Sequence, residues 1–198
     1  MKTAIVTIEG LSPYSQSKAH EDPMLPKELH DAYERRTWRS RMHVTPNGHV
    51  EIPASALANA VKDAAKYLSI SVPGKGKSTF TKHFDAGVMV VEGIELPVLA
   101  ADVPSDRLFV PTNGQPGGGH RAWKWFPRID KWGGAFEAIV VDDIITPEVF
   151  KQVWDAAGSI VGIGRFRPRN RGFYGRFAVK SIVWQDEVES LASMSRAR

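Results

Sequence analysis

The chain has 198 residues, of which 42% are hydrophobic and 24% charged, which fits one globular domain with a sizeable core. Lysine and arginine exceed the acids by only 26 to 22, although the sequence pI is near 9.4, so the distribution of charge matters more than its sum. The absence of cysteine excludes disulfides and thiolate zinc sites, and no apolar run fits a signal peptide or a membrane span. We therefore expect a cytoplasmic protein without a membrane partner.

The first third of the chain predicts two strands and one helix. Residues 3–9 are rich in β-branched side chains and predict the first strand. Residues 12–42 show little periodicity, which predicts a long loop with one short helix. A short strand at 49–53 is followed by a helix with Ser55 as its expected N-cap. The expected inward face of this helix carries Leu57, Val61, Ala64, Ala65 and Leu68.

The middle of the chain predicts several short strands between flexible connections. A basic, glycine-containing loop at 72–83 precedes strand candidates at 87–92, 95–99 and 107–111. The glycine-rich run at 113–119 cannot form regular structure and predicts the flexible tip of a hairpin.

The last third predicts a strand, a helix and a final strand. Strand character returns at 135–141, and Thr146 followed by Pro147 predicts a capped helix start. This helix is expected to stop at Gly158, and the final strand is expected at 174–184.

The order of these elements predicts an α+β fold of ferredoxin-like (RRM-like) type with long inserted loops and a β-hairpin insertion. We expect a single domain over residues 1–185. Its loop insertions are expected at about 12–45 and 72–134, and residues 186–198 are expected to form a flexible tail.

Residues 162–177, here called the glycine loop, hold five arginines and no acid. Glycines let a backbone approach phosphates, arginines offer forked donors, and aromatic rings offer stacking surfaces. The loop therefore predicts single-stranded nucleic-acid binding, with a solvated basic turn as the alternative. It lacks a Gly-Lys-Ser/Thr ending and leads into a strand, so it matches no nucleotide or dinucleotide loop. The expected contact residues are Arg165, Arg167, Arg169, Arg171, Phe173, Tyr174 and Arg176.

Three segments share patterns with a known family. Residues 51–62 resemble the Ile-Pro-Gly-Ser-Ser-Leu-Lys-Gly-Ala-Leu-Arg segment of the RAMP superfamily, the RNA-binding subunits of CRISPR effector complexes. The glycine loop resembles the C-terminal glycine-rich loop of that superfamily, and residues 10–15 resemble its opening. The family's second serine, lysine and glycine fall on Ala56, Ala58 and Asn59.

The resemblance implies a RAMP core like that of the backbone subunit, which binds CRISPR guide RNA and forms a filament of its own copies beside other effector subunits. Single-stranded DNA stays open as the ligand, because arginine–phosphate contacts are common to both nucleic acids. We expect no enzymatic activity, catalytic residue, metal or cofactor. Further expected contact residues are Tyr14, Ser15, Gln16, Lys18, Ser55, Lys62, Lys75, Lys77, Lys82, Trp123 and Lys124.

Several readings stay open at this point. The aromatic and basic run at 121–128 either stacks bases or contributes core aromatics to a strand. The resemblance implies that the arginine-rich run at 35–41 belongs to a loop that arches over the nucleic-acid strand or contacts a neighbouring subunit. The alternative is a solvated helix face. An endoribonuclease is the enzymatic alternative, and a mobile-element mimic that interferes with a host CRISPR complex is a third. A metal or acid–base site for the enzyme would use His20, Asp22, His30 and Asp31.

Overall fold

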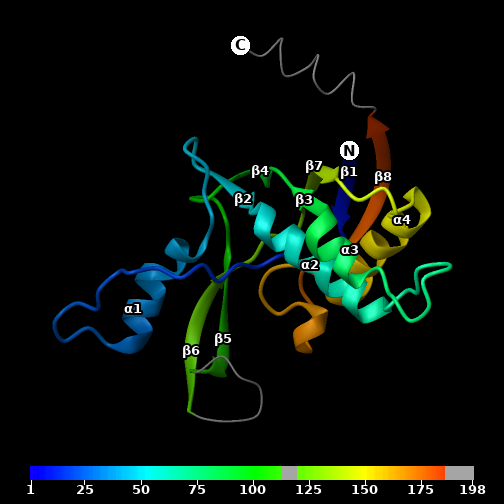
Figure 1. The fold of residues 1–198 in the computed structure, drawn as a ribbon. Helices are drawn as coiled ribbons and strands as arrows, with labels where there is room; N and C mark the ends of the chain where they lie inside the picture. Colours follow the sequence, from blue (N-terminus) through cyan, green and yellow to red (C-terminus); the bar gives the residue numbers. More distant parts are fainter. Residues whose placement is uncertain (113–119, 186–198) are drawn as a thin grey trace.

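The computed structural model describes residues 1–112 and 120–185, and its main sheet has four antiparallel strands in the order β3-β7-β1-β8 (Figure 1). The expected hairpin tip at 113–119 and the expected tail at 186–198 lie outside the described residues. The strands are β1 (Lys2–Gly10), β3 (Val88–Val90), β7 (Gly133–Val140) and β8 (Phe177–Gln185).

Two helices complete a ferredoxin-like core. Helix α2 (Ala54–Leu68) joins β1 to β3 in chain order, and α4 (Pro147–Ala156) joins β7 to β8. The core order is therefore strand, helix, two strands, helix, strand, with the last strand beside the first. Rings from α4 pack on the sheet, where the Trp154 and Phe136 centroids are 5.0 Å apart. The α+β, ferredoxin-like prediction is confirmed.

The sequence predicted the start of α4 correctly, but not the end of that helical segment or the N-cap of α2. Thr146 Oγ1 accepts a hydrogen bond from Val149 N at 3.4 Å, so the expected cap of α4 is confirmed. The helical path does not stop at Gly158, because a π-turn, η2 (Ala157–Val161), extends it. Gly158 is needed for packing there, since a Cβ would lie 2.1 Å from Phe177 O. Ser55 is not the N-cap of α2, because Pro53 holds that position.

The remaining strands form two small sheets. Strand β2 (His49–Ile52) pairs with β4 (Ile94–Leu99), and β5 (Ser105–Pro111) pairs with β6 (Arg121–Pro127) in the expected hairpin. Strand β3 lies inside the range 72–134, so part of that expected insertion belongs to the main sheet.

Three further elements surround the core. Helix α3 (Thr81–Gly87) was not predicted: it begins within the loop expected at 72–83 and ends at residue 87, where a strand was expected to begin. The expected short helix in the first long loop is α1 (His30–Thr37), continued by the 3-10 turn η1 (Trp38–Arg41). Another 3-10 turn, η3 (Pro168–Asn170), lies within the glycine loop.

Helix α1 and the β5–β6 hairpin stand together on one side of the core (Figure 1). They are joined by Arg107, whose Nη2 donates to Asp31 Oδ1 at 2.8 Å, and by Arg35, whose guanidinium lies 5.6 Å from the Trp125 ring centroid. Among the described residues, no helix is both long enough and apolar enough to cross a membrane.

Candidate nucleic-acid interface

The glycine loop is fastened to the segment that follows β1. Arg165 N donates to Ser15 O at 2.8 Å, and Gly175 N donates to Pro13 O at 2.8 Å. Near the start of β8, Arg176 N donates to Ser12 Oγ at 3.0 Å. These hydrogen bonds delay the final strand, which begins at Phe177 rather than at residue 174. The loop is thus a fixed part of the fold.

An open groove of about 340 Å³ lies where this loop meets the start of α2, and we call it the Arg165 groove. Its volume is at the lower end of the range for small-molecule pockets, roughly 300–1,000 Å³. The groove brings together residues from all three segments that carry the family resemblance, which are 10–15, 51–62 and the glycine loop. It also includes residues 16–18, which directly follow the first of these segments. It is lined by Tyr14, Gln16, Ser17, Lys18, His43, Pro53, Ser55, Ala56, Asn59, Gly164 and Arg165.

Gly164 forms the wall of the groove at a position that only glycine fits. Its φ is +73°, and an added Cβ would lie 2.3 Å from Ser15 O and 2.5 Å from Tyr14 Cε2. Side chains rarely adopt this backbone conformation, and here they also lack space. Gly164 therefore lets the loop close onto the segment after β1.

Arg165 is a half-buried cation that makes no ion pair among the described residues, although the charge of Glu34 acts on it from a distance. Its guanidinium lies 3.5 Å from the Phe126 ring centroid and 4.4 Å from that of Phe166. Its Nη1 donates to Ser17 Oγ at 3.2 Å, and its buried Nε has no hydrogen-bond partner. Burial, and then repulsion from Arg41, lowers the pKa of Arg165 to about 10, so it remains charged at neutral pH. An anion in the groove would relieve this unbalanced charge.

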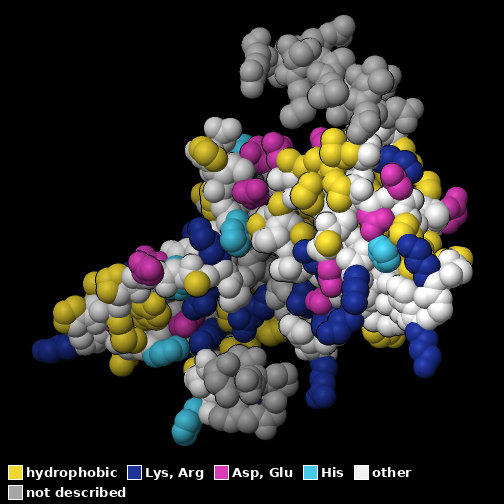
Figure 2. Space-filling model, viewed as in Figure 1, with side chains coloured by type: hydrophobic (Ala, Val, Ile, Leu, Met, Phe, Trp, Pro, Cys, Tyr) yellow, Lys and Arg dark blue, Asp and Glu magenta, His cyan; other side chains and the backbone are white. Residues whose placement is uncertain are grey.

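Other groups in the groove also favour an anion. Lys18 and Ser55 are exposed there, and the first turn of α2 presents amide groups without helical acceptors. His43 has its pKa lowered, first by burial and then by the charge of Lys18. Figure 2 shows Lys and Arg side chains gathered across the lower part of this face, between the α1 side of the molecule and the core.

The other loop arginines are balanced in ways that the sequence does not show. Arg169 Nη1 lies 2.7 Å from Asp63 Oδ1 on α2, and Arg167 Nη2 lies 3.6 Å from Asp63 Oδ2. Arg176 Nε donates to Ser159 O at 3.3 Å. Arg171 is exposed and has no ion pair among the described residues. The loop contains no acid itself, but the fold supplies one.

The two aromatic residues expected at the loop have different environments. Phe173 is 61% exposed and available to a ligand. Tyr174 packs beneath the loop and donates its hydroxyl to Asp106 Oδ2 on β5 at 2.7 Å. Burial, followed by this hydrogen bond, raises the pKa of Tyr174 to about 12. Tyr174 therefore joins the loop to the hairpin.

Tyr14, Ser15 and Gln16 shape the groove from inside the protein. All three are buried, and burial raises the pKa of Tyr14. Gln16 Nε2 donates to Tyr14 Oη at 3.0 Å and to Glu51 O at 2.6 Å, while its Oε1 accepts from His43 N at 2.6 Å. The structure thus gives Gln16 a positioning role toward His43 and leaves the exposed Lys18 as the reachable cation of this segment.

Several expected contact residues lie away from the groove. Lys75, Lys77 and Lys82 follow the C-terminal end of α2, whereas the groove is at its N-terminal end. A helix of 15 residues is about 22 Å long, so one bound phosphate cannot join these regions. Lys62 is half-buried in the middle of α2.

The two hairpin candidates lie on opposite faces of β6, because successive strand residues alternate. Lys124 shares a face with Phe126, which contacts Arg165 of the glycine loop. Trp123 is 45% exposed on the other face, where its ring lies 5.3 Å from Phe109 and 4.5 Å from the Arg107 guanidinium. The Trp123 ring is therefore exposed and does not belong to the core.

The sheet face that lies opposite α2 and α4 does not offer the aromatic platform of an RRM. By strand register, its central rows carry aliphatic side chains and Glu137, and no aromatic residue occurs there among the described residues. The aliphatic members are Ile5, Met89, Ile139 and Val183.

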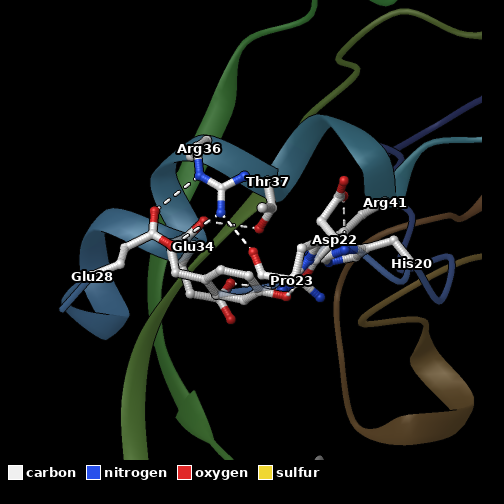
Figure 3. Close-up of polar contacts among 9 residues, drawn as sticks. His20, Asp22, Pro23, Glu28, Glu34, Arg36, Thr37 and Arg41 are labelled. Atoms are coloured by element: carbon white, nitrogen blue, oxygen red, sulfur yellow. Dashed lines mark hydrogen bonds and ion pairs between the residues drawn. The ribbon is translucent and has the colours of Figure 1, made fainter. Parts of the chain in front are cut away.

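The four residues considered for a metal or acid–base site are not gathered into one cluster. His20 Nδ1 lies 3.0 Å from Asp22 Oδ2 (Figure 3). Asp31 instead pairs with Arg107 on the hairpin. No group of three His, Asp or Glu suited to a metal occurs in residues 1–112 and 120–185. Sequence reasoning missed a pair between His83 Nδ1 and Asp142 Oδ2 at 2.6 Å, which lowers the pKa of Asp142.

These features define a ferredoxin-like α+β protein with a basic groove between its C-terminal loop and its first core helix. No protein-family model matches the chain, and no curated protein matches its sequence.

Two solved structures are similar to the chain in overall fold. The crystal structure of Cmr6 from Pyrococcus furiosus has 13% sequence identity and a TM-score of 0.47, over 89% of this chain and 97% of that one. A CRISPR RNA-guided surveillance complex has 11% identity and a TM-score of 0.38, over 92% of this chain and 68% of that one.

Proposed function

We propose that this chain binds the sugar–phosphate backbone of single-stranded RNA in the Arg165 groove and acts as a CRISPR-associated backbone subunit, several copies of which follow one guide strand. The observation that supports this most is the convergence of the three family-like segments on one groove that holds an unbalanced cation. The sequence resemblance supplies the CRISPR context.

A phosphate in the groove would accept hydrogen bonds from groups of three kinds. Arg165 and Lys18 provide charge, Ser55 provides a hydroxyl, and the first turn of α2 provides backbone amides with the positive end of the helix dipole. None of these groups reads a base, so binding is expected to be weakly sequence-dependent. Bases would remain free to pair or to stack on exposed rings such as Phe173.

A Ser55→Asp variant tests the groove directly. A carboxylate in the first turn favours the helix dipole and so preserves folding, but it repels a phosphate in the groove. Ser181→Asp on β8 is the matched control, because it adds the same charge at an exposed position outside the groove. Fluorescence anisotropy with a labelled single-stranded RNA should show weaker binding for Ser55→Asp than for wild type, and unchanged binding for Ser181→Asp.

Salt dependence and nucleic-acid type complete this test. Affinity should fall with salt with a slope of about −0.7 for each phosphate neutralised. Single-stranded DNA and duplex RNA serve as competitors, and sequencing of copurified nucleic acid identifies the natural strand. Equal binding by Ser55→Asp and wild type, or an affinity insensitive to salt, would contradict the proposal.

The purified protein is proposed not to hydrolyse RNA, with or without divalent metal. Cleavage assays with Asp22→Ala and Asp31→Ala address the enzymatic alternative, since metal-dependent cutting lost in either variant would establish an endoribonuclease.

A further inference from the structure

A second groove, here called the Tyr67 groove, lies between α2, η2 and η3. Its volume is about 390 Å³, and its apolar walls come from Tyr67, Ile160, Val161 and Pro168. Apolar walls beside a few polar groups are typical of small-molecule sites, which measure roughly 300–1,000 Å³. The lining therefore suits a ligand that has an apolar face and polar edges.

The Tyr67 ring offers a stacking surface in this groove. Its side chain is 65% exposed, and it makes no hydrogen bond or ring contact among the residues that the structure describes. Ile160 is 38% exposed, so the apolar wall can also be reached from solvent. A ring that the fold leaves uncovered can stack on any nucleobase, since every base has an aromatic face.

The wall that the glycine loop contributes to this groove is preformed. Asn170 N donates to Arg167 O and Arg171 N donates to Pro168 O, both at 2.9 Å, which holds the η3 turn. Gly162 lets this turn pack closely, because its φ is +70° and an added Cβ would lie 2.5 Å from Pro168 Cδ. Little conformational entropy is therefore lost when a ligand enters.

The Tyr67 groove lies farther along the walls that form the Arg165 groove. Helix α2 and the glycine loop, which is orange in Figure 1, line both grooves. The first groove uses residues 55–59 of α2 and the second uses residues 63–67. The centres of these ranges are about eight residues apart, or about 12 Å along the helix. That distance corresponds to about three or four stacked nucleotides at about 3.4 Å each, so one strand can reach both grooves.

The charges around the Tyr67 groove favour a phosphate backbone. Among the described residues, Asp63 is the single acid of the lining, and its carboxylate is balanced by both Arg169 and Arg167. Lys66 is exposed on the rim and has no ion pair within the described part of the chain. Three cations therefore surround one carboxylate. A nucleic-acid strand matches this arrangement, because it offers phosphates to the rim and bases to the apolar walls.

We infer that the Tyr67 groove binds a nucleobase of the same strand whose phosphate lies in the Arg165 groove. Tyr67 stacks on the base, and Arg169 and Lys66 lie on the side of the neighbouring phosphates. The inference rests on the proposed function and deepens it, because it adds a contact to a base where the Arg165 groove contacts only the backbone. Stacking does not depend on the identity of the base, so binding stays weakly sequence-dependent.

Removal of the bases from the ligand tests this contact. A single-stranded RNA and an abasic ribose–phosphate strand of the same length offer the same phosphates, so their affinities differ through the bases alone. Tyr67→Ala should lower the preference of the protein for RNA over the abasic strand by about 5- to 150-fold, with unchanged affinity for the abasic strand. Tyr67→Phe keeps the ring and should keep the preference. Val183→Ala, which removes an exposed apolar side chain on β8, is the control and should behave like wild type.

A free nucleoside tests the groove without a strand. In saturation-transfer NMR, adenosine should give a signal with wild type and with Tyr67→Phe. The signal should be largely lost with Tyr67→Ala and with Ile160→Lys, which places a charged side chain in the apolar wall. Ribose 5-phosphate, which has no base, is the control ligand and should give no signal that depends on Tyr67.

The outcomes separate this inference from the proposed function. In a wild type that binds RNA, an equal preference for RNA in Tyr67→Ala and wild type would overturn the base site and leave the groove to another partner, such as a protein. An equal loss of affinity for both strands in Tyr67→Ala would overturn it too, because Tyr67 would then act on the backbone or the fold. A wild type that binds neither strand would count against the proposed function. The adenosine signal alone then decides, since its dependence on Tyr67 supports the base site and its absence overturns it.

Discussion

Replacing Arg165 by alanine separates a binding role from a structural one. The side chain makes no ion pair among the described residues, and its contacts to the protein are Ser17 and the rings of Phe126 and Phe166. Each cation–π contact contributes about 0.5–1 kcal/mol when partly exposed. Relief of the burial of an unbalanced charge offsets part of that loss. We therefore expect the free energy of unfolding to fall by no more than about 1 kcal/mol.

Binding should suffer more than folding in this variant. A charge-assisted hydrogen bond contributes about 1.5–3 kcal/mol, so Arg165→Ala should weaken single-stranded RNA binding by about 10- to 150-fold. The salt slope should also become shallower by about 0.7. Arg165→Lys keeps the charge but loses the planar stacking, and should give an intermediate affinity.

Anisotropy titrations at two salt concentrations, beside urea unfolding, measure both effects. Lys151→Ala on α4 is the control for loss of one positive charge. A folded Arg165→Ala protein that binds RNA as tightly as wild type, with an unchanged salt slope, would refute the groove as the phosphate site.

Three further changes test neighbouring parts of the site. Asp63→Ala should free Arg167 and Arg169 and tighten RNA binding by about 2- to 5-fold, and the free energy of unfolding should fall by less than about 1 kcal/mol. Unchanged affinity in titrations would show that these arginines do not reach the RNA strand. Gly164→Val should lower the melting temperature and weaken binding together, because its φ of +73° and the absent space for a Cβ force the loop away, and a wild-type melting curve would contradict this. His43 has a lowered pKa, so its protonation destabilises the fold as pH falls below the ordinary value of about 6.5, while the added charge strengthens RNA binding; His43→Gln should reduce both trends in titrations between pH 7.5 and 5.5.

Local patterns predicted the core because the relevant interactions are close in sequence. Leu57, Val61 and Ala64 recur at helical spacing and are buried in α2, and Thr146 caps α4 through a residue three positions away. The first strand, the last helix and the hairpin follow for the same reason. Their order then determines the ferredoxin-like sheet through ordinary rules of strand connection.

The site was less predictable because its members meet only in the folded chain. Asp63 belongs to a helix and no sequence pattern links it to Arg167 or Arg169, so the sequence of the loop alone shows no balancing acid. Gln16 looked like a ligand contact but is buried because it accepts from His43 N.

The first long loop shows the same limit for secondary structure. Helix α1 is held by ion pairs and by its contact with the hairpin, so the segment needs little apolar periodicity. The ion pairs include Arg36 with Glu28, and Arg41 with Glu34, whose Nη2 and Oε2 atoms are 2.7 Å apart. Only the short helix itself could be expected from the sequence.

The groove and the β5–β6 hairpin are joined through one aromatic ring, because Phe126 of the hairpin packs against Arg165 of the groove. Phe126 on β6 receives the Arg165 guanidinium at 3.5 Å and that of Arg41 at 5.4 Å, while Tyr174 binds Asp106 on β5. A nucleic-acid strand that binds Arg165 would therefore be held at a defined distance from β6. Lys124 shares the loop-facing side of β6, whereas Trp123 faces away from it. We therefore expect a nucleic-acid strand in the groove to lie on the Lys124 side of β6, which makes the lysine the candidate for a backbone contact and Trp123 the candidate for a separate stacking surface.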